Sequence, residues 1–192
     1  MLIEVINGCR SHKAFSHCAN SFSEKLPRFF EQQTTPIWQR RSHMIKGVHH
    51  IGVSTRNLKH LLQFYCDVLG FELIREMGWK SGTELGDVVD RIIGIKNSSA
   101  KGAMVTKGGV TIEMFEYSAP EPKPIPSGWK VCDHGYTHIC VEVDDIDGEY
   151  ERLSKAGVTF HAPPQAFGGM KAVYCRDPEG HVIELLEVLP VA

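Results

Sequence analysis

An internal repeat constrains this 192-residue chain more than any other feature of its sequence. Residues 50–54 (HIGVS) resemble residues 138–142 (HICVE), and residues 110–116 (VTIEMFE) resemble residues 181–187 (HVIELLE). The first pair opens each copy with the β-branched alternation that is typical of a strand. The second pair closes each copy in the same way. Repetition of this kind predicts one structural unit that is built twice.

Each copy carries one amphipathic helix pattern between these ends. In the first copy the pattern covers residues 57–69, with apolar residues three and four apart, and in the second it covers residues 145–156. Gly70 and Gly157 follow as caps. Extended runs and glycine- or proline-containing turns come next in both copies. We therefore predict an α+β fold of two tandem βαβββ modules.

The modules span about residues 46–117 and 134–189, and three segments fall outside their pattern. Residues 118–133 contain alternating prolines, which favour an extended connector. Residues 78–101 carry a short helical stripe, either a surface flap or a lid over a pocket. Residues 1–44 show no sustained periodicity, so we expect either that translation starts at Met44 or that this leader is disordered.

Composition excludes several classes of function. The 21 Lys and Arg residues nearly balance the 23 Asp and Glu residues, and no basic stripe is present, so we expect no nucleic-acid partner. No apolar run approaches the roughly 20 residues that cross a bilayer, so we expect no membrane partner. The six cysteines form no close pairs. They indicate reduced, mostly buried thiols in a cytoplasmic protein.

A histidine and a glutamate recur at matching places in the two copies. Because side chains alternate across a strand, His50 and His138 face away from the apolar side that receives the helix. Glu113 and Glu184 lie between apolar residues in the last strands, where a carboxylate is costly to bury unless it is paired or bound to a cation. If the copies pack about a local two-fold axis, the four side chains converge on the cavity between them.

These four residues form a mixed nitrogen and oxygen donor set. Two imidazoles and two carboxylates suit Zn, Ni, Co, Mn or Fe(II) better than Ca or Mg. We therefore predict one divalent metal held by His50, Glu113, His138 and Glu184, with open positions of the kind that a catalytic metal keeps. The alternative is that each residue is ordinary, a hydrogen-bonded strand histidine or a salt-bridged edge glutamate.

Other polar residues nearby are expected to be exposed to solvent. Glu116 and Glu187 lie three positions beyond the predicted ligand glutamates, so they face away and are expected at solvated strand ends. His134 and His181 adjoin turns and are expected to be exposed.

The wall of the predicted cavity is aromatic. Phe115 and Tyr117 share the strand face of the first ligand glutamate, whereas Trp79, Trp129 and Phe167 lie in flanking loops. Core packing is an equally good explanation for each one alone. Together they favour a hydrophobic or aromatic oxygenated substrate.

With these residues in place, the chain resembles the vicinal oxygen chelate superfamily, which includes glyoxalase I, methylmalonyl-CoA epimerase, extradiol dioxygenases and the fosfomycin and bleomycin resistance proteins. The resemblance covers about residues 45–189 and is carried most specifically by residues 64–71 (FYCDVLGF) and 177–185 (DPEGHVIEL). It implies a cup-shaped mixed sheet around the metal and the same four ligands. It also implies that the metal stabilises an enolate or a related anion.

The presence of all four ligands favours the lyase and isomerase branch, of the glyoxalase I or epimerase type. There we expect Glu184 to act as the base that removes a carbon-bound proton, with Glu113 as the alternative. An extradiol-type Fe(II) dioxygenase is the second reading, although that branch needs only two histidines and one glutamate. A small-molecule-binding module of the drug-resistance type is the third. The expected partner is a small-molecule substrate, and a homodimer is left open.

Overall fold

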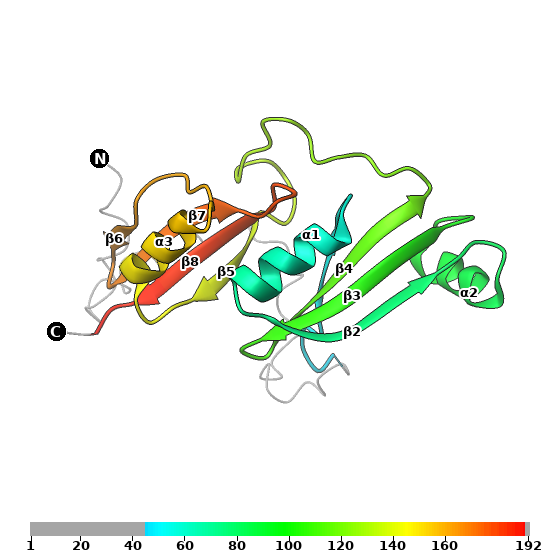
Figure 1. Ribbon diagram of the computed structural model, residues 1–192, viewed down its shortest axis with the longest axis horizontal. Coiled ribbons are helices and arrows are strands. Elements are labelled where there is room, and N and C mark those ends of the chain that lie inside the picture. Colours follow the sequence, from blue (N-terminus) through cyan, green and yellow to red (C-terminus); the bar gives the residue numbers. More distant parts are fainter. Residues whose placement is uncertain (1–44, 191–192) are drawn as a thin grey trace, which may run out of the picture. The chain divides into compact units, whose positions relative to one another are not determined.

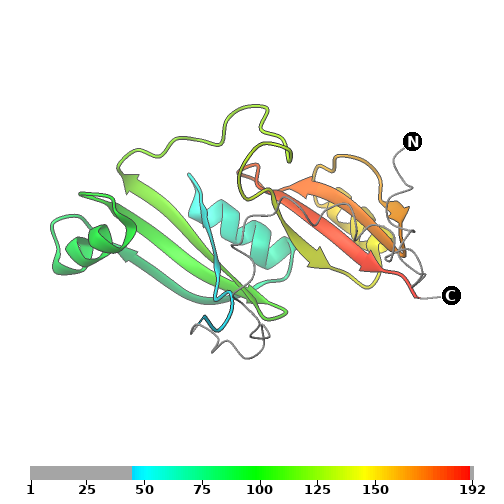
Figure 2. The same ribbon diagram turned by 180° about the vertical axis from the view of Figure 1, so that it is seen from behind.

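Two four-stranded sheets carry the fold, and both have the same strand order (Figures 1 and 2). The computed structural model describes residues 45–190. The strands of the first sheet, in order across it, are β1 (Ile51–Ser54), β4 (Val110–Ala119), β3 (Ser99–Lys107) and β2 (Glu72–Trp79). Those of the second are β5 (His138–Glu142), β8 (Val182–Val188), β7 (Met170–Arg176) and β6 (Gln165–Phe167).

The two sheets are mixed in the same way. In the first sheet β1 pairs parallel with β4, and in the second β5 pairs parallel with β8. The other two pairings of each sheet are antiparallel. The predicted α+β class with tandem βαβββ modules is confirmed. One local expectation differs, because the apolar run after Gly157 makes only an isolated bridge between Phe160 and Cys175 before β6 begins. The predicted boundaries between modules and connector stay a prediction, and the leader of residues 1–44 lies outside the described residues.

Each module has its helix where the apolar spacing predicts it. In the first, α1 (Leu58–Gln63) continues into the π-helical segment η2 (Phe64–Val68), and in the second α3 (Ile146–Lys155) lies on one face of its sheet (Figure 1). Gly70 and Gly157 follow with φ of 71° and 88°, a left-handed conformation that glycine adopts without strain.

Glu116 and Glu187 connect the last strand of each module to its helix. Glu116 Oε2 accepts a hydrogen bond from the backbone N–H of Leu58 at 2.7 Å, and Glu187 Oε2 accepts one from Ile146 at 3.0 Å. Both groups satisfy an orphan donor at a helix N-terminus and place negative charge there. The expectation of solvated strand ends is therefore wrong, since both side chains are half-buried and each caps the helix of its module.

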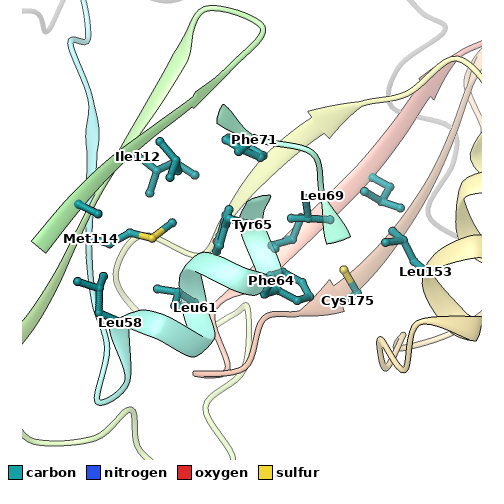
Figure 3. Close-up of a cluster of buried hydrophobic side chains, with 14 of the residues drawn as sticks. Leu58, Leu61, Phe64, Tyr65, Leu69, Phe71, Ile112, Met114, Leu153 and Cys175 are labelled. Atoms are coloured by element: carbon teal, nitrogen blue, oxygen red, sulfur yellow. The ribbon is translucent and has the colours of Figure 1, made fainter. Parts of the chain in front are cut away.

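The hydrophobic core confirms the predicted strand parity and runs through both modules. Ile112 and Met114 are fully buried on the helix side of β4, so Glu113 between them lies on the opposite face. Figure 3 places Leu69 and Phe64 of the first module beside Cys175 and Leu153 of the second.

Polar contacts add to this shared core. Hydrogen bonds join the modules at three places. The Tyr65 hydroxyl donates to Asp177 Oδ2 at 3.3 Å, and Arg152 Nη2 donates to the Val68 carbonyl at 2.8 Å. Glu179 Oε1 accepts from Thr55 Oγ1 at 2.8 Å and from the Arg56 backbone N–H at 3.3 Å. The chain from Val48 onward accordingly forms one compact unit.

The excursion between β2 and β3 contains α2 (Glu84–Ile93), as its helical stripe predicts. Leu85, Val88 and Ile92 are exposed along it, at 56%, 39% and 75%. An apolar stripe that faces solvent agrees with either a flap or a lid. Across residues 45–190, no helix combines the length and the apolar character needed to span a membrane.

The four cysteines within the described residues are all free. Cys175 is buried and Cys66 is half-buried, but Cys132 and Cys140 are exposed. The expectation of mostly buried thiols is therefore wrong for the last two.

Candidate metal and substrate site

Each module joins its predicted ligand histidine to its predicted ligand glutamate. His50 Nε2 lies 3.1 Å from Glu113 Oε2, and His138 Nε2 lies 3.0 Å from Glu184 Oε2. The parallel pairing of β1 with β4, and of β5 with β8, produces these contacts. Glu113 is paired with Gly52, and Glu184 is paired with Cys140. Each histidine lies two residues before that paired residue, so the histidine and the glutamate are on the same face of the sheet.

The second ring nitrogen of each histidine is also engaged. His50 Nδ1 lies 2.8 Å from Nδ1 of His49, and His138 Nδ1 lies 2.9 Å from Oγ1 of Thr137. Contacts of this kind fix the orientation of an imidazole, which is what a ligand histidine requires.

The two pairs do not meet at one point. Within residues 45–190, no group of three or more His, Cys, Asp or Glu side chains is close enough together to hold a metal ion. The structure thus brings His50 to Glu113 and His138 to Glu184, but it does not bring the pairs together. A single centre with all four ligands stays a prediction.

Both predicted ligand histidines, His50 and His138, nevertheless line one cavity of about 700 Å³. His134 and His181 contribute two further imidazoles to its wall. The proline-rich connector supplies Ile125, Pro126 and Trp129, so this segment forms part of the cavity as well as joining the modules. Trp129 is the one predicted aromatic residue that lines this cavity.

Three other predicted aromatic residues form a cluster on the first sheet, and the expectation that Trp79 lies in a loop is wrong, because Trp79 is the last residue of β2. The ring of Trp79 lies 5.3 Å from that of Phe115 and 5.7 Å from that of Tyr117, both centroid distances in near-perpendicular pairs. Phe115 and Tyr117 follow the predicted ligand Glu113 at alternate positions of β4, and burial and the negative charge of Glu113 raise the pKa of the Tyr117 hydroxyl. The cluster therefore continues the Glu113 face along β4.

Phe167 lies elsewhere. Its side chain is 55% exposed on β6, at the opposite edge of the second sheet from β5. The sequence predicted a flanking loop for Phe167, but it is the last residue of the edge strand β6, and it belongs neither to the cavity wall that contains Trp129 nor to the cluster around Trp79.

The second module adds two residues to the site that the sequence analysis did not include. Tyr174 stands opposite Glu184 in the β7–β8 register, and its ring centroid lies 5.1 Å from that of His138. Burial, Glu184 and Cys140 raise the pKa of Tyr174, while burial and Glu184 raise the pKa of Cys140 to about 11. A signal was available in the sequence, since counting back from the turn at residues 177–180 places Tyr174 opposite Glu184.

His181 is not the exposed residue that its turn position predicts. Its Nδ1 lies 2.8 Å from Oδ2 of Asp177, whose side chain is fully buried. Burial alone would lower the pKa of His181, but the hydrogen bond to Asp177 and the charges of Asp177 and Glu179 raise it above its ordinary value. His134, in contrast, is exposed as expected.

Comparison with known proteins identifies the family to which the chain belongs. The sequence profile of the Glyoxalase/Bleomycin resistance protein/Dioxygenase superfamily matches residues 47–185. The chain belongs to this superfamily, and the resemblance drawn from its motifs is confirmed.

Individual relatives share at most about a third of their aligned residues with this chain. An uncharacterized Escherichia coli K12 protein, YaeR, is 30% identical over 146 residues, which are 74% of this chain and 97% of YaeR. A 2-epi-5-epi-valiolone epimerase from Actinomyces sp. is 29% identical over 153 residues, 74% of this chain and 79% of the epimerase. The crystal structure of a glyoxalase family protein from Bacillus cereus superimposes with a TM-score of 0.68 at 22% identity, covering 78% of this chain and 99% of that one, which supports the fold.

Proposed function

We propose that this chain is a divalent-metal-dependent isomerase or lyase that removes a proton from the carbon next to a carbonyl group of a small oxygenated substrate. The observation that carries the proposal is the recurrence of one His–Glu pair at the same register position in both modules. A chance ion pair on a strand face has no reason to recur in this way.

The donor chemistry fits a divalent cation. Each pair offers an imidazole nitrogen and a carboxylate oxygen about 3 Å apart on one strand face, and mixed N/O sets suit Zn, Ni, Co, Mn or Fe(II). One cation held by all four side chains requires the two pairs to lie closer than they do in the structure. A bound cation would polarise a substrate carbonyl and make the neighbouring carbon-bound proton more acidic.

In this proposal the residues of the chain hold the substrate and move the proton. Glu184 acts as the base, because its carboxylate lies on the strand face that carries both His138 and Tyr174. Tyr174 can donate a hydrogen bond to Glu184 or to a substrate oxygen, since its raised pKa keeps the hydroxyl protonated at neutral pH. Glu113 is the alternative base. The aromatic cluster beside Glu113 and the connector residue Trp129 pack against apolar parts of the substrate.

The similarity to an epimerase supports this reaction class. An epimerase inverts one stereocentre, and proton removal followed by return to the other face of the carbon is a direct route to that result. The identity of 29% leaves the substrate of this chain open.

Metal content is the first test. Protein purified without chelators and without oxygen should contain about one Ni, Zn, Co or Mn per chain by elemental mass spectrometry. If one cation uses both pairs, His50→Ala and His138→Ala should each abolish binding, whereas His134→Ala should not, because His134 is exposed and makes no ion pair within the described residues. No metal after reconstitution would contradict the proposal and favour a binding module.

Proton exchange is the second test. Metal-loaded protein should catalyse deuterium incorporation next to the carbonyl when a panel of 2-oxoaldehydes and α-hydroxyketones is followed by NMR in D₂O. Glu184→Gln should lower the exchange rate by about 100-fold or more, the usual contribution of a general base. About one Fe(II) per chain, with oxygen consumption instead of exchange, would indicate a dioxygenase.

A further inference from the structure

The turn between β7 and β8 builds a fixed, buried carboxylate. Asp177 Oδ1 accepts hydrogen bonds from the backbone N–H groups of Glu179 and His181, both at 2.9 Å. Its Oδ2 accepts from the Tyr65 hydroxyl at 3.3 Å and lies 2.8 Å from His181 Nδ1. The side chain of Asp177 is fully buried, so these donors hold it in one orientation.

A buried carboxylate favours a cationic neighbour, and the imidazole of His181 lies against Asp177. Because a carboxylate can only accept, the proton between the two groups lies on His181 Nδ1. Removing the positive charge from such a buried pair is strongly unfavourable. The raised pKa of His181 agrees with this arrangement.

The remaining ring nitrogen of His181 is free to meet a ligand. The imidazole is 25% exposed and lines the same cavity as His50 and His138. Among the described residues, its side chain bonds only to Asp177, through Nδ1. Nε2 is the ring nitrogen that remains, and it donates a hydrogen bond when the imidazole is protonated, which is the form that the adjacent Asp177 carboxylate favours.

Surrounding charges favour an anion at this part of the wall. The Arg176 guanidinium donates to the carbonyls of Gly180 at 2.7 Å and Trp129 at 3.0 Å, which ties the connector to the turn and adds positive charge. The other acid of the turn, Glu179, is engaged by the hydroxyl of Thr55 and by Arg56.

We propose that the Asp177–His181 pair forms an anion subsite in this cavity, with His181 Nε2–H binding a carboxylate or phosphonate oxygen of the substrate and Asp177 positioning the ring. This subsite rests on the proposed function, in which the substrate binds in this cavity, and it restricts the substrate to molecules with an anionic group. The substrate then has an anionic group, a chelating pair of oxygens near the ligand histidines, and an apolar part against Trp129.

The test compares two kinds of chelator on metal-loaded protein by calorimetry. Acetohydroxamate carries only the chelating group, and the monohydroxamates of malonic, succinic and glutaric acid add a carboxylate at increasing reach. The wild type should bind at least one of the acids about tenfold more tightly than acetohydroxamate, as expected for one charge-assisted hydrogen bond. His181→Gln should remove this preference and leave the Kd of acetohydroxamate unchanged.

The matched control is His134→Gln, because His134 lines the same cavity without a carboxylate partner within the described residues. It should keep the preference. A wild type without preference for any of the acids, or a preference that persists in His181→Gln, would overturn the subsite. Failure of acetohydroxamate itself to bind would count against the metal centre and not against His181.

Nuclear magnetic resonance of the ring nitrogens tests the subsite without metal, and its first step uses the wild type alone. Methylphosphonate added to the metal-free wild type should shift the ¹⁵N signal of His181 Nε2, while Nδ1 stays protonated against Asp177. Asp177→Asn should abolish the shift, whereas a purely structural Asp177 would leave it unchanged. A His181 Nε2 signal that does not move in the wild type sinks the proposal.

Discussion

The hydroxyl of Tyr65 in η2 donates a hydrogen bond to Asp177 Oδ2 in the β7–β8 turn, across the boundary between the two modules. Both residues are buried, at 1% and 5% exposure. Burial and the neighbouring Asp177 raise the pKa of Tyr65 well above its ordinary value, so the hydroxyl is a donor at neutral pH. The same carboxylate holds His181, and this contact therefore links the core to the cavity wall.

Tyr65→Phe should lower the free energy of unfolding by about 1–2 kcal/mol, because Asp177 loses one of its donors while the ring still fills its place in the core. Urea denaturation followed by circular dichroism measures the difference. The control is Tyr136→Phe, an exposed tyrosine, for which a change below about 0.5 kcal/mol is expected. Equal effects of the two substitutions would contradict a specific role for the contact.

Glu116→Gln should destabilise the protein at neutral pH by about 1 kcal/mol, because Glu116 accepts from Leu58 at the N-terminus of α1. Burial would raise the pKa of Glu116, but the Leu58 N–H and Lys101 lower it below 4.5. A carboxyl group with a lowered folded pKa contributes fully above its unfolded pKa and loses that contribution as pH falls through the folded value.

The difference between wild type and Glu116→Gln should accordingly shrink as pH falls below about 4.5. Urea titrations at pH 7 and pH 4 measure it. Glu121→Gln, in the exposed connector, is the control and should show no difference at either pH. A destabilisation that is independent of pH would mean that size and packing, and not charge, carry the effect.

Strand parity and the repeat were enough to predict that His50 and Glu113 share a face, because the alternation of side chains is a local property of a strand. They were not enough to predict the distance between the two His–Glu pairs, which depends on how the modules pack. The role of Glu116 was missed for a similar reason. Strand parity predicts the face on which a side chain lies, but it does not predict that the N-terminus of α1 packs against that face.

His181 was misjudged because residues beside turns are usually solvated. Here the turn folds back so that Asp177, four residues earlier, is buried under Tyr65 and needs a cationic neighbour. Such a requirement comes from tertiary packing and is invisible to periodicity.

Ser98→Ala should cost about 1–3 kcal/mol of unfolding free energy, although it removes a single oxygen. Ser98 is fully buried, and its hydroxyl accepts from Trp79 Nε1 at 2.7 Å while it donates to Asp90 on α2. The substitution leaves the Trp79 N–H without its acceptor and breaks the side-chain link between Trp79 and α2, although the backbone N–H groups of Asn97 and Ser98 still donate to Asp90. Hydrogen exchange should show faster opening of α2. Ser154→Ala, on the exposed face of α3, should change stability by no more than about 0.5 kcal/mol, and an equal loss there would contradict the assignment.

Gly102→Ala should disturb the aromatic cluster without touching a predicted ligand. A Cβ atom at Gly102 would lie 2.7 Å from the Met114 carbonyl oxygen and 2.8 Å from Cδ1 of Phe115, so the ring must move and the β3–β4 pairing must adjust. We expect a loss of about 1–3 kcal/mol, typical of overpacking, together with a change in near-ultraviolet circular dichroism. Gly52→Ala is the matched control, because a Cβ there meets nothing within 4 Å although Gly52 is paired with Glu113 in the same sheet. If both glycines tolerate alanine equally, the close contact between Phe115 and the β3 backbone does not position the ring, and the cluster owes its order to Trp79 and Tyr117.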